Sequence, residues 1–135
     1  MNNDAYSATT HGITVSVRSL YLADQSDPDE NQYMWAYRIR ITNNARVTVQ
    51  LQRRTWHITD AIGRQQMVHG EGVVGEKPVI APGHFYEYQS GTPLATASGL
   101  MHGTYHMIET ATGLTFDIEI PSFSLDSPFQ TGRLH

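Results

Sequence analysis

The sequence predicts an all-β fold: an immunoglobulin-like or fibronectin-type-III-like β-sandwich of about seven to eight antiparallel strands. Three observations support this fold class. Apolar and polar residues alternate along most of the chain, which is the period of half-buried strands. Turn signals recur at intervals close to the roughly 8–12 residues that are typical of sandwiches. No segment sustains the 3.6-residue period of a helix.

The first half of the chain contains three of these strands. Residues 13–22 alternate, and a change of parity between Val17 and Leu20 predicts a bulge. The clearest strand spans residues 33–41, where aromatic and β-branched residues share one face and arginines lie on the other. A third strand runs through residues 47–58, with another switch of parity between Leu51 and Trp56, across its two arginines. The polar loop between the first two strands reads as a turn.

The second half alternates strands with glycine- and proline-rich turns. The expected segments are a strand near residues 65–68, a glycine-rich stretch 70–75, a proline-framed stretch 78–83, a strand 84–89, a loop 91–99 with one short helical turn, and a hairpin of 100–108 with 114–120. Pro121 limits the last strand to an edge or an exit, because proline cannot donate to a ladder.

The length of 135 residues predicts one domain, since two would leave each half short of core. We expect that domain to span residues 12–126, with a flexible N-terminus at 1–11 and a loosely ordered tail at 127–135. The chain has no cysteine, which excludes disulfides, thiolate metal clusters and a cysteine nucleophile.

Charge and hydropathy exclude further classes of protein. Nine basic and thirteen acidic residues give a net charge of −4, which argues against general nucleic-acid binding. No stretch approaches the roughly 18 apolar residues of a membrane helix. The first seven residues lack a secretory signal, so we expect a cytoplasmic protein.

The stretch 70–75 spells G-x-G-x-x-G, with Gly70, Gly72 and Gly75 at the fixed positions. A dinucleotide-binding motif needs a following helix, and the prolines after Lys77 make one unfavourable. A weaker version remains, in which glycine amides and Lys77 form an anion-binding nest. In the alternative reading, the glycines serve bulges or turns of positive φ.

Other polar clusters give weaker signals. His102 and His106 share a strand face but lie roughly 13 Å apart, too far to chelate one ion together. The acidic loop at residues 24–30 lacks the spacing of a calcium loop. Asp117 and Glu119 point outward together and read as solvated. We therefore expect no metal site, no cofactor and no catalytic residue set.

Aromatic residues are more numerous than one inward face comfortably holds, so some must face outward. An exposed sheet face rich in Tyr, Met and His is a surface for a protein partner. An unpaired edge strand offers a second route, through β-augmentation or through pairing with a second copy of the chain.

Several stretches in register resemble the bacterial ApaG (CorD) family. They are SDPDENQYMWAYRIRITN (26–43), RTWHITD (54–60) followed by Gly63 and Arg64, VHGEGVVGEKP (68–78), PGHFYEYQSG (82–91) and GLMHGTYHM (99–107). The resemblance covers about residues 12–126 and implies a fibronectin-type-III-like sandwich. It also implies a link to cobalt resistance and magnesium efflux, and a role in protein–protein contact, because related domains occur as appended modules. It supplies no catalytic residues, but its glycine motif keeps binding of a nucleotide or a divalent cation open as an alternative. A hydrolase with an unrecognised site is a third possibility.

Overall fold

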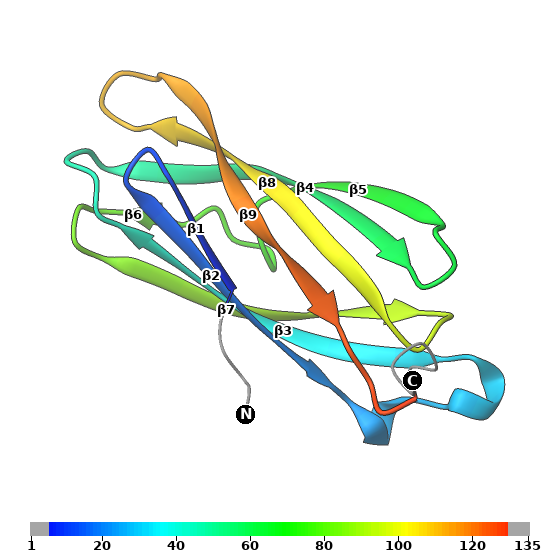
Figure 1. Cartoon of the computed structure of the whole chain (residues 1–135). Coiled ribbons are helices and arrows are strands. Elements are labelled where there is room, and N and C mark those ends of the chain that lie inside the picture. Colours follow the sequence, from blue (N-terminus) through cyan, green and yellow to red (C-terminus); the bar gives the residue numbers. More distant parts are fainter. Residues whose placement is uncertain (1–5, 130–135) are drawn as a thin grey trace.

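The computed structural model describes residues 6–129, which form nine strands in two packed antiparallel sheets (Figure 1). The first sheet, in the order β1-β2-β3-β7, contains Tyr6–Thr10, Ile13–Tyr21, Tyr33–Asn43 and Phe85–Leu94. The second, in the order β5-β4-β8-β9, contains Gln65–Glu71, Val49–Asp60, Gly99–Glu109 and Thr115–Leu125, and β6 (Val79–Ile80) also pairs with β4. Two short 3₁₀ turns, η1 (Ala23–Gln25) and η2 (Pro28–Glu30), occupy the polar loop. The predicted β-sandwich is confirmed.

The core lies between the sheets and is built by alternate residues of each strand. In β3, Trp35 and Ile39 are fully buried, as their shared parity predicts. The second sheet contributes Leu51 and Tyr105, which are equally buried. Each such side chain stabilises the fold by roughly 1.5–3 kcal/mol. The indole Nε1 of Trp35 donates to the carbonyl of Asp126 at 2.8 Å, which fixes the segment after β9 against the core.

One of the two predicted bulges is correct. The register between β4 and β8 shifts between Leu51 and Arg53, so the parity of β4 changes at Gln52. As a result, Arg54 shares the inward face with Trp56 instead of pointing to solvent. This bulge determines much of what lies between the sheets.

The bulge predicted in β2 is wrong. The strand pairs with β3 without interruption from Ile13 to Tyr21. Ser19 and Tyr21 therefore continue the inward face, and Leu20 points outward with 64% of its surface exposed. The sequence interpretation continued the apolar pattern to Leu20 by means of a bulge, but the continuous hydrogen-bonded register decides the side of this residue.

The two sides of the sandwich differ. On one side β9 packs against β1 and β2, which is visible where the orange strand runs beside the blue ones (Figure 1). The Tyr6 and Ser124 hydroxyls lie 2.8 Å apart across this side, and the Glu119 amide donates to Thr10 Oγ1. On the other side, the edges of β5 and β7 flank a cleft between the sheets. We call this the open side.

Some element boundaries differ from expectation. Residues 91–94 extend β7 and are not part of a loop, because they pair with the start of β3. The hairpin of β8 and β9 is confirmed, and β9 is an edge strand that continues past Pro121 with a register shift opposite. Residues 6–10, within the expected N-terminal extension, form β1. Residues 1–5 and 130–135 lie outside the described part of the chain.

No helix within residues 6–129 has the length and apolar character needed to cross a bilayer.

Candidate functional sites

The cleft on the open side has a volume of about 330 Å³ and is lined by both sheets. Its walls combine apolar side chains with a small number of polar groups, which is the usual composition of a ligand pocket. The residues that line it are Tyr37, Arg54, Trp56, Ile58, Gln66, Val68, Val73, Val74, Tyr88, Ser90, Gly91, Thr92, Pro93 and Met101.

Arg54 is the charged residue of this cleft, and Gly70 makes its position possible. The two residues face each other across β4 and β5. A Cβ on Gly70 would lie 2.6 Å from the guanidinium carbon of Arg54, so any larger residue would displace that side chain. Nη1 of Arg54 donates to the carbonyl oxygens of Glu71 at 3.0 Å and Gly72 at 2.7 Å. Gly70 therefore provides the space for an inward arginine.

The rest of the glycine motif forms a tight turn. Gly72 has a φ of +58°, and its amide donates to the Gln52 carbonyl at 2.8 Å. Val73 and Glu76 exchange two backbone hydrogen bonds across the turn, at 2.8 and 2.9 Å. The amides of Gly72, Val73 and Glu76 are thus used within the fold.

Val74 and Gly75 lie at the tip of this turn, both with positive φ, at +48° and +79°. Gly75 adopts this conformation without strain, whereas for a β-branched residue it is a genuine outlier. The side chain of Val74 is 61% exposed and lines the cleft. Strained residues of this kind cost about 1–3 kcal/mol and cluster at functional sites.

Lys77, the fourth residue of the predicted anion site, lies close to the turn but is engaged elsewhere. Its Nζ donates to Glu71 Oε1 at 2.8 Å. The hydrogen bond from Lys77 and the nearby positive charges hold the pKa of the Glu71 carboxyl below its usual value. The structure thus brings Gly70, Gly72 and Lys77 together around Glu71, with Gly75 at the tip of the turn.

Three tyrosine hydroxyls lie deep in or beside the cleft. The Tyr88 and Tyr105 hydroxyls are 2.5 Å apart. Ser90 lines the cleft beside Tyr37 and partly offsets the rise that burial causes in the pKa of Tyr37. Burial raises the pKa of Tyr37, Tyr88 and Tyr105, and the charge of Arg54 opposes that shift. All three stay protonated and neutral at physiological pH, so none supplies a negative charge to Arg54.

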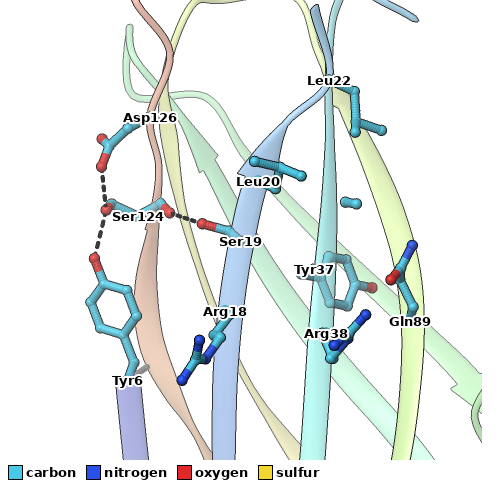
Figure 2. Close-up of a pocket in the computed structure, with 11 residues that line it drawn as sticks. Tyr6, Arg18, Ser19, Leu20, Leu22, Tyr37, Arg38, Gln89, Ser124 and Asp126 are labelled. Atoms are coloured by element: carbon cyan, nitrogen blue, oxygen red, sulfur yellow. Dashed lines mark hydrogen bonds between the residues drawn. The ribbon is translucent and has the colours of Figure 1, made fainter. Parts of the chain in front are cut away.

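A second hollow, of about 480 Å³, lies along the first sheet and extends to Ser124 of β9 (Figure 2). Arg18 of β2 and Arg38 of β3 are directly opposite each other there, and both are exposed. Leu20 and Leu22 line the same hollow. Within residues 6–129, neither arginine has an ion-pair partner. Asp126 lines the hollow too, where its carboxylate accepts a hydrogen bond from Ser124. We call this surface the arginine face.

Histidines meet on the outer face of the second sheet. The rings of His57 and His102 stack with centroids 4.8 Å apart. His106 Nδ1 lies 2.8 Å from an oxygen of Asp117, a carboxylate that the sequence interpretation left solvated. The Nε2 atom of His106 is 2.8 Å from Thr55 Oγ1.

His69 completes this chain from the other side, with Nδ1 3.0 Å from the same Thr55 oxygen. The order hydroxyl, imidazole, carboxylate is that of a catalytic triad. However, Thr55 is only 7% exposed, and its hydroxyl bonds with two imidazoles at once. That arrangement favours a role in holding three strands together. Among residues 6–129, no three His, Asp or Glu side chains are placed to hold a metal ion.

Comparisons with known proteins agree with this architecture. Residues 23–109 match the family model described as the ApaG domain. The chain belongs to the ApaG family. Protein ApaG of Paramagnetospirillum magneticum is 60% identical over 130 residues, which is 96% of this chain and 99% of the relative. Protein ApaG of Rhodospirillum centenum is 55% identical over 128 residues, with 95% and 98% covered.

Solved structures extend the ApaG match to the fold. A crystal structure of the ApaA protein from Bordetella pertussis superposes with a TM-score of 0.83 at 46% identity, covering 87% of this chain and 95% of that one. The C-terminal domain of wzt shares the fold alone, with a TM-score of 0.55 at 10% identity over 93% of this chain and 78% of that one. The ApaG resemblance read from the sequence is thereby confirmed.

Sequence reasoning missed two features of these sites. It found the parity switch in β4 but did not conclude that Arg54 would turn inward. It also did not single out Arg18 and Arg38, because their pairing depends on the register between β2 and β3. The sequence does show that each of these arginines lies on the polar face of its strand. That they lie opposite each other follows only from the register between the two strands.

Proposed function

We propose that this ApaG-family protein is a non-enzymatic interaction module whose arginine face binds an acidic segment of a partner protein. The observation that carries the proposal is the pair of Arg18 and Arg38, which lie opposite each other and form no ion pair with any of the described residues, although Asp126 lines the same hollow. Like charges directly opposite on neighbouring strands destabilise a sheet. Carboxylates of a partner would relieve that repulsion and accept charge-assisted hydrogen bonds.

A third arginine on the same face serves as an internal comparison. Nε of Arg40 donates to Glu87 at 2.7 Å, and its guanidinium lies 4.2 Å from the centre of the Phe85 ring. One arginine of the face is therefore neutralised within the fold while its two neighbours are not. In a chain with a net charge of −4, this local positive charge supports recognition of an acidic surface.

The apolar part of the arginine face favours a protein over a small anion. Leu20 is 64% exposed beside Arg18, and Leu22 lines the same hollow. A free anion would leave these side chains in water, whereas a peptide segment with an aliphatic residue between its carboxylates would cover them. Burial of apolar area adds roughly 25 cal/mol per Å² to such contact.

The first test measures binding of a fluorescent peptide of glutamate and leucine by anisotropy, with a lysine and leucine peptide for comparison. We expect saturable binding of the acidic peptide alone, weakened by salt because the contacts are exposed. Charge reversal by Arg38→Glu should weaken binding roughly tenfold or more.

The matched control is Arg46→Glu, an exposed arginine in the turn before β4 with the same change in net charge. We expect this variant to bind like the wild type. Equal losses in the two variants would reduce the effect to net charge and would refute a specific face.

The sequence-based alternative is binding of a nucleotide, pyrophosphate or divalent cation by the Gly70–Gly75 loop. The geometry supports it less, because the amides of Gly72, Val73 and Glu76 already donate within the fold. It stays a prediction that an amide titration with diadenosine tetraphosphate and magnesium tests. Saturating shifts confined to this loop would establish it.

The family link to cobalt resistance and magnesium efflux would act through the protein that the arginine face binds.

Pairing of two copies of the chain through an edge strand also stays a prediction. Sedimentation velocity over a range of concentrations tests it, since a dimer would appear as a mass that rises with concentration.

A further inference from the structure

We propose that the cleft on the open side is a binding site for a small organic anion, namely a carboxylate attached to an apolar body. Arg54 of this cleft does not line the hollow of the arginine face, and Arg18 and Arg38 do not line the cleft, although Tyr37 borders both. Three features of the cleft support the assignment: an uncompensated charge, an unused hydrogen-bond donor and an apolar lining.

The charge belongs to Arg54. The guanidinium is half-buried, and within residues 6–129 no carboxylate forms an ion pair with it. Its hydrogen bonds go from Nη1 to two backbone carbonyls, which leaves its other nitrogens available. A half-buried cation that is matched only by neutral oxygens retains a strong preference for an anion. A planar carboxylate suits the fork of a guanidinium.

The donor belongs to Trp56, which has only 3% of its surface exposed. The Nε1 N–H has no hydrogen-bond partner in the described part of the chain. The Cε3 atom of the indole lies 3.2 Å from the position that a Cβ on Gly103 would take, and Trp56 lines the cleft. Nε1 is closed off from solvent, so a ligand oxygen reaches it only after a rotation of the indole towards the cleft. An unsatisfied buried donor costs about 1–3 kcal/mol, which that new hydrogen bond would recover.

The lining and shape fit the remaining part of such a ligand. Ile58, Val68 and Met101 supply apolar walls in a cleft of about 330 Å³, near the lower end of the usual size for small-molecule sites. The strained turn places Val74 at this cleft with its side chain exposed. An apolar body that contacts Val74 would bury it, and a fully hydrated ion would not.

The two tryptophans allow a direct test by NMR. Their indole N–H signals appear apart from the backbone amides, and Trp35 Nε1 is already bonded to a carbonyl in the core. Titration with hexanoate should move the Trp56 indole signal saturably to lower field and leave that of Trp35 in place. Hexanol has the same chain without the charge and should have little effect.

Inorganic pyrophosphate is the third probe and separates this site from an anion nest in the neighbouring loop. The proposal is overturned if hexanoate leaves the Trp56 signal unmoved, if hexanol moves it as strongly, or if only pyrophosphate does. This measurement uses the wild-type protein, so it does not depend on the folding of a variant.

A pair of variants tests the role of the charge. Arg54→Gln should weaken hexanoate binding roughly tenfold or more, since hydrogen bonds to charged groups contribute about 1.5–3 kcal/mol. Arg53→Gln removes the same charge from the neighbouring residue, which is exposed on the outer face of β4, and should bind like the wild type. Equal affinity of Arg54→Gln and wild type would refute the assignment.

Discussion

Replacing Gly72 and Gly75 separately with alanine distinguishes two costs that a glycine can avoid. Both residues have positive φ, at +58° and +79°. Each alanine therefore carries a backbone penalty of roughly 1 kcal/mol in the left-handed region. Around Gly75 nothing lies within 4 Å of the added Cβ, so its cost ends there.

At Gly72 a Cβ would lie 2.2 Å from the backbone oxygen of Glu76. That oxygen accepts the hydrogen bond from Val73, and Glu76 donates back to Val73. Moving it away disrupts both bonds of the turn, at about 1 kcal/mol each. The expected loss is then roughly 3 kcal/mol for Gly72→Ala, against roughly 1 kcal/mol for Gly75→Ala.

Urea unfolding followed by tryptophan fluorescence measures both losses. In thermal unfolding the same difference should lower Tm by roughly 10 °C for Gly72→Ala and roughly 4 °C for Gly75→Ala. Equal destabilisation of the two variants would refute the reasoning, because it would mean that the contact with Glu76 relaxes without cost.

Three further predictions concern other buried or paired groups. Asn43→Ala should cost about 3 kcal/mol in urea unfolding, because this buried amide bonds with three backbone groups; a loss near zero would contradict it. Tyr88→Phe and Tyr105→Phe should each cost about 1–2 kcal/mol and the double variant no more than the larger single loss, whereas additive losses would argue against their bond. Lys77→Met should raise the pKa of Glu71, measured by carboxyl ¹³C titration, and an unchanged midpoint would exclude their hydrogen bond as the cause. Since the Lys77 contact lowers that pKa, its contribution to stability is present above the unfolded-state pKa and is lost as pH falls through the folded one.

The fold could be predicted largely because burial imposes strict alternation. In β3 every second residue from Trp35 to Ile41 is buried, so a period of two is enough to identify the strand and its inward face. Leu20 shows the limit of this rule. Alternation and apolarity disagree there, and the uninterrupted pairing of β2 with β3 determines the result.

The candidate sites were harder to predict because they depend on contacts between distant strands. The parity switch near Arg53 and Arg54 is visible in the sequence, but a bulge only says that the faces exchange. Which arginine turns inward depends on the residue at which the register shifts, and Gln52 is not distinguished by its chemistry. The space that Gly70 leaves for Arg54 arises only when β5 pairs with β4.

The glycine motif gives a third case. The spacing of its three glycines is plain in the sequence, yet each glycine has a different structural role. Gly70 provides space, Gly72 combines space with an unusual backbone, and Gly75 supplies the backbone alone. A one-dimensional pattern cannot separate these roles, because each depends on what lies beside the glycine after folding.

The packing of the last strand against the first two has a consequence for biosynthesis. The contact between Tyr6 and Ser124 joins residues 118 positions apart, so the side of the sandwich where β9 packs against β1 and β2 cannot form until β9 has been made. A chain that grows from its N-terminus therefore carries Val15 and Val17 on an incompletely covered face during most of its synthesis. Translation interrupted before Thr115 should yield a fragment for proteolysis instead of a partly working protein, and this makes the supply of the protein all-or-none.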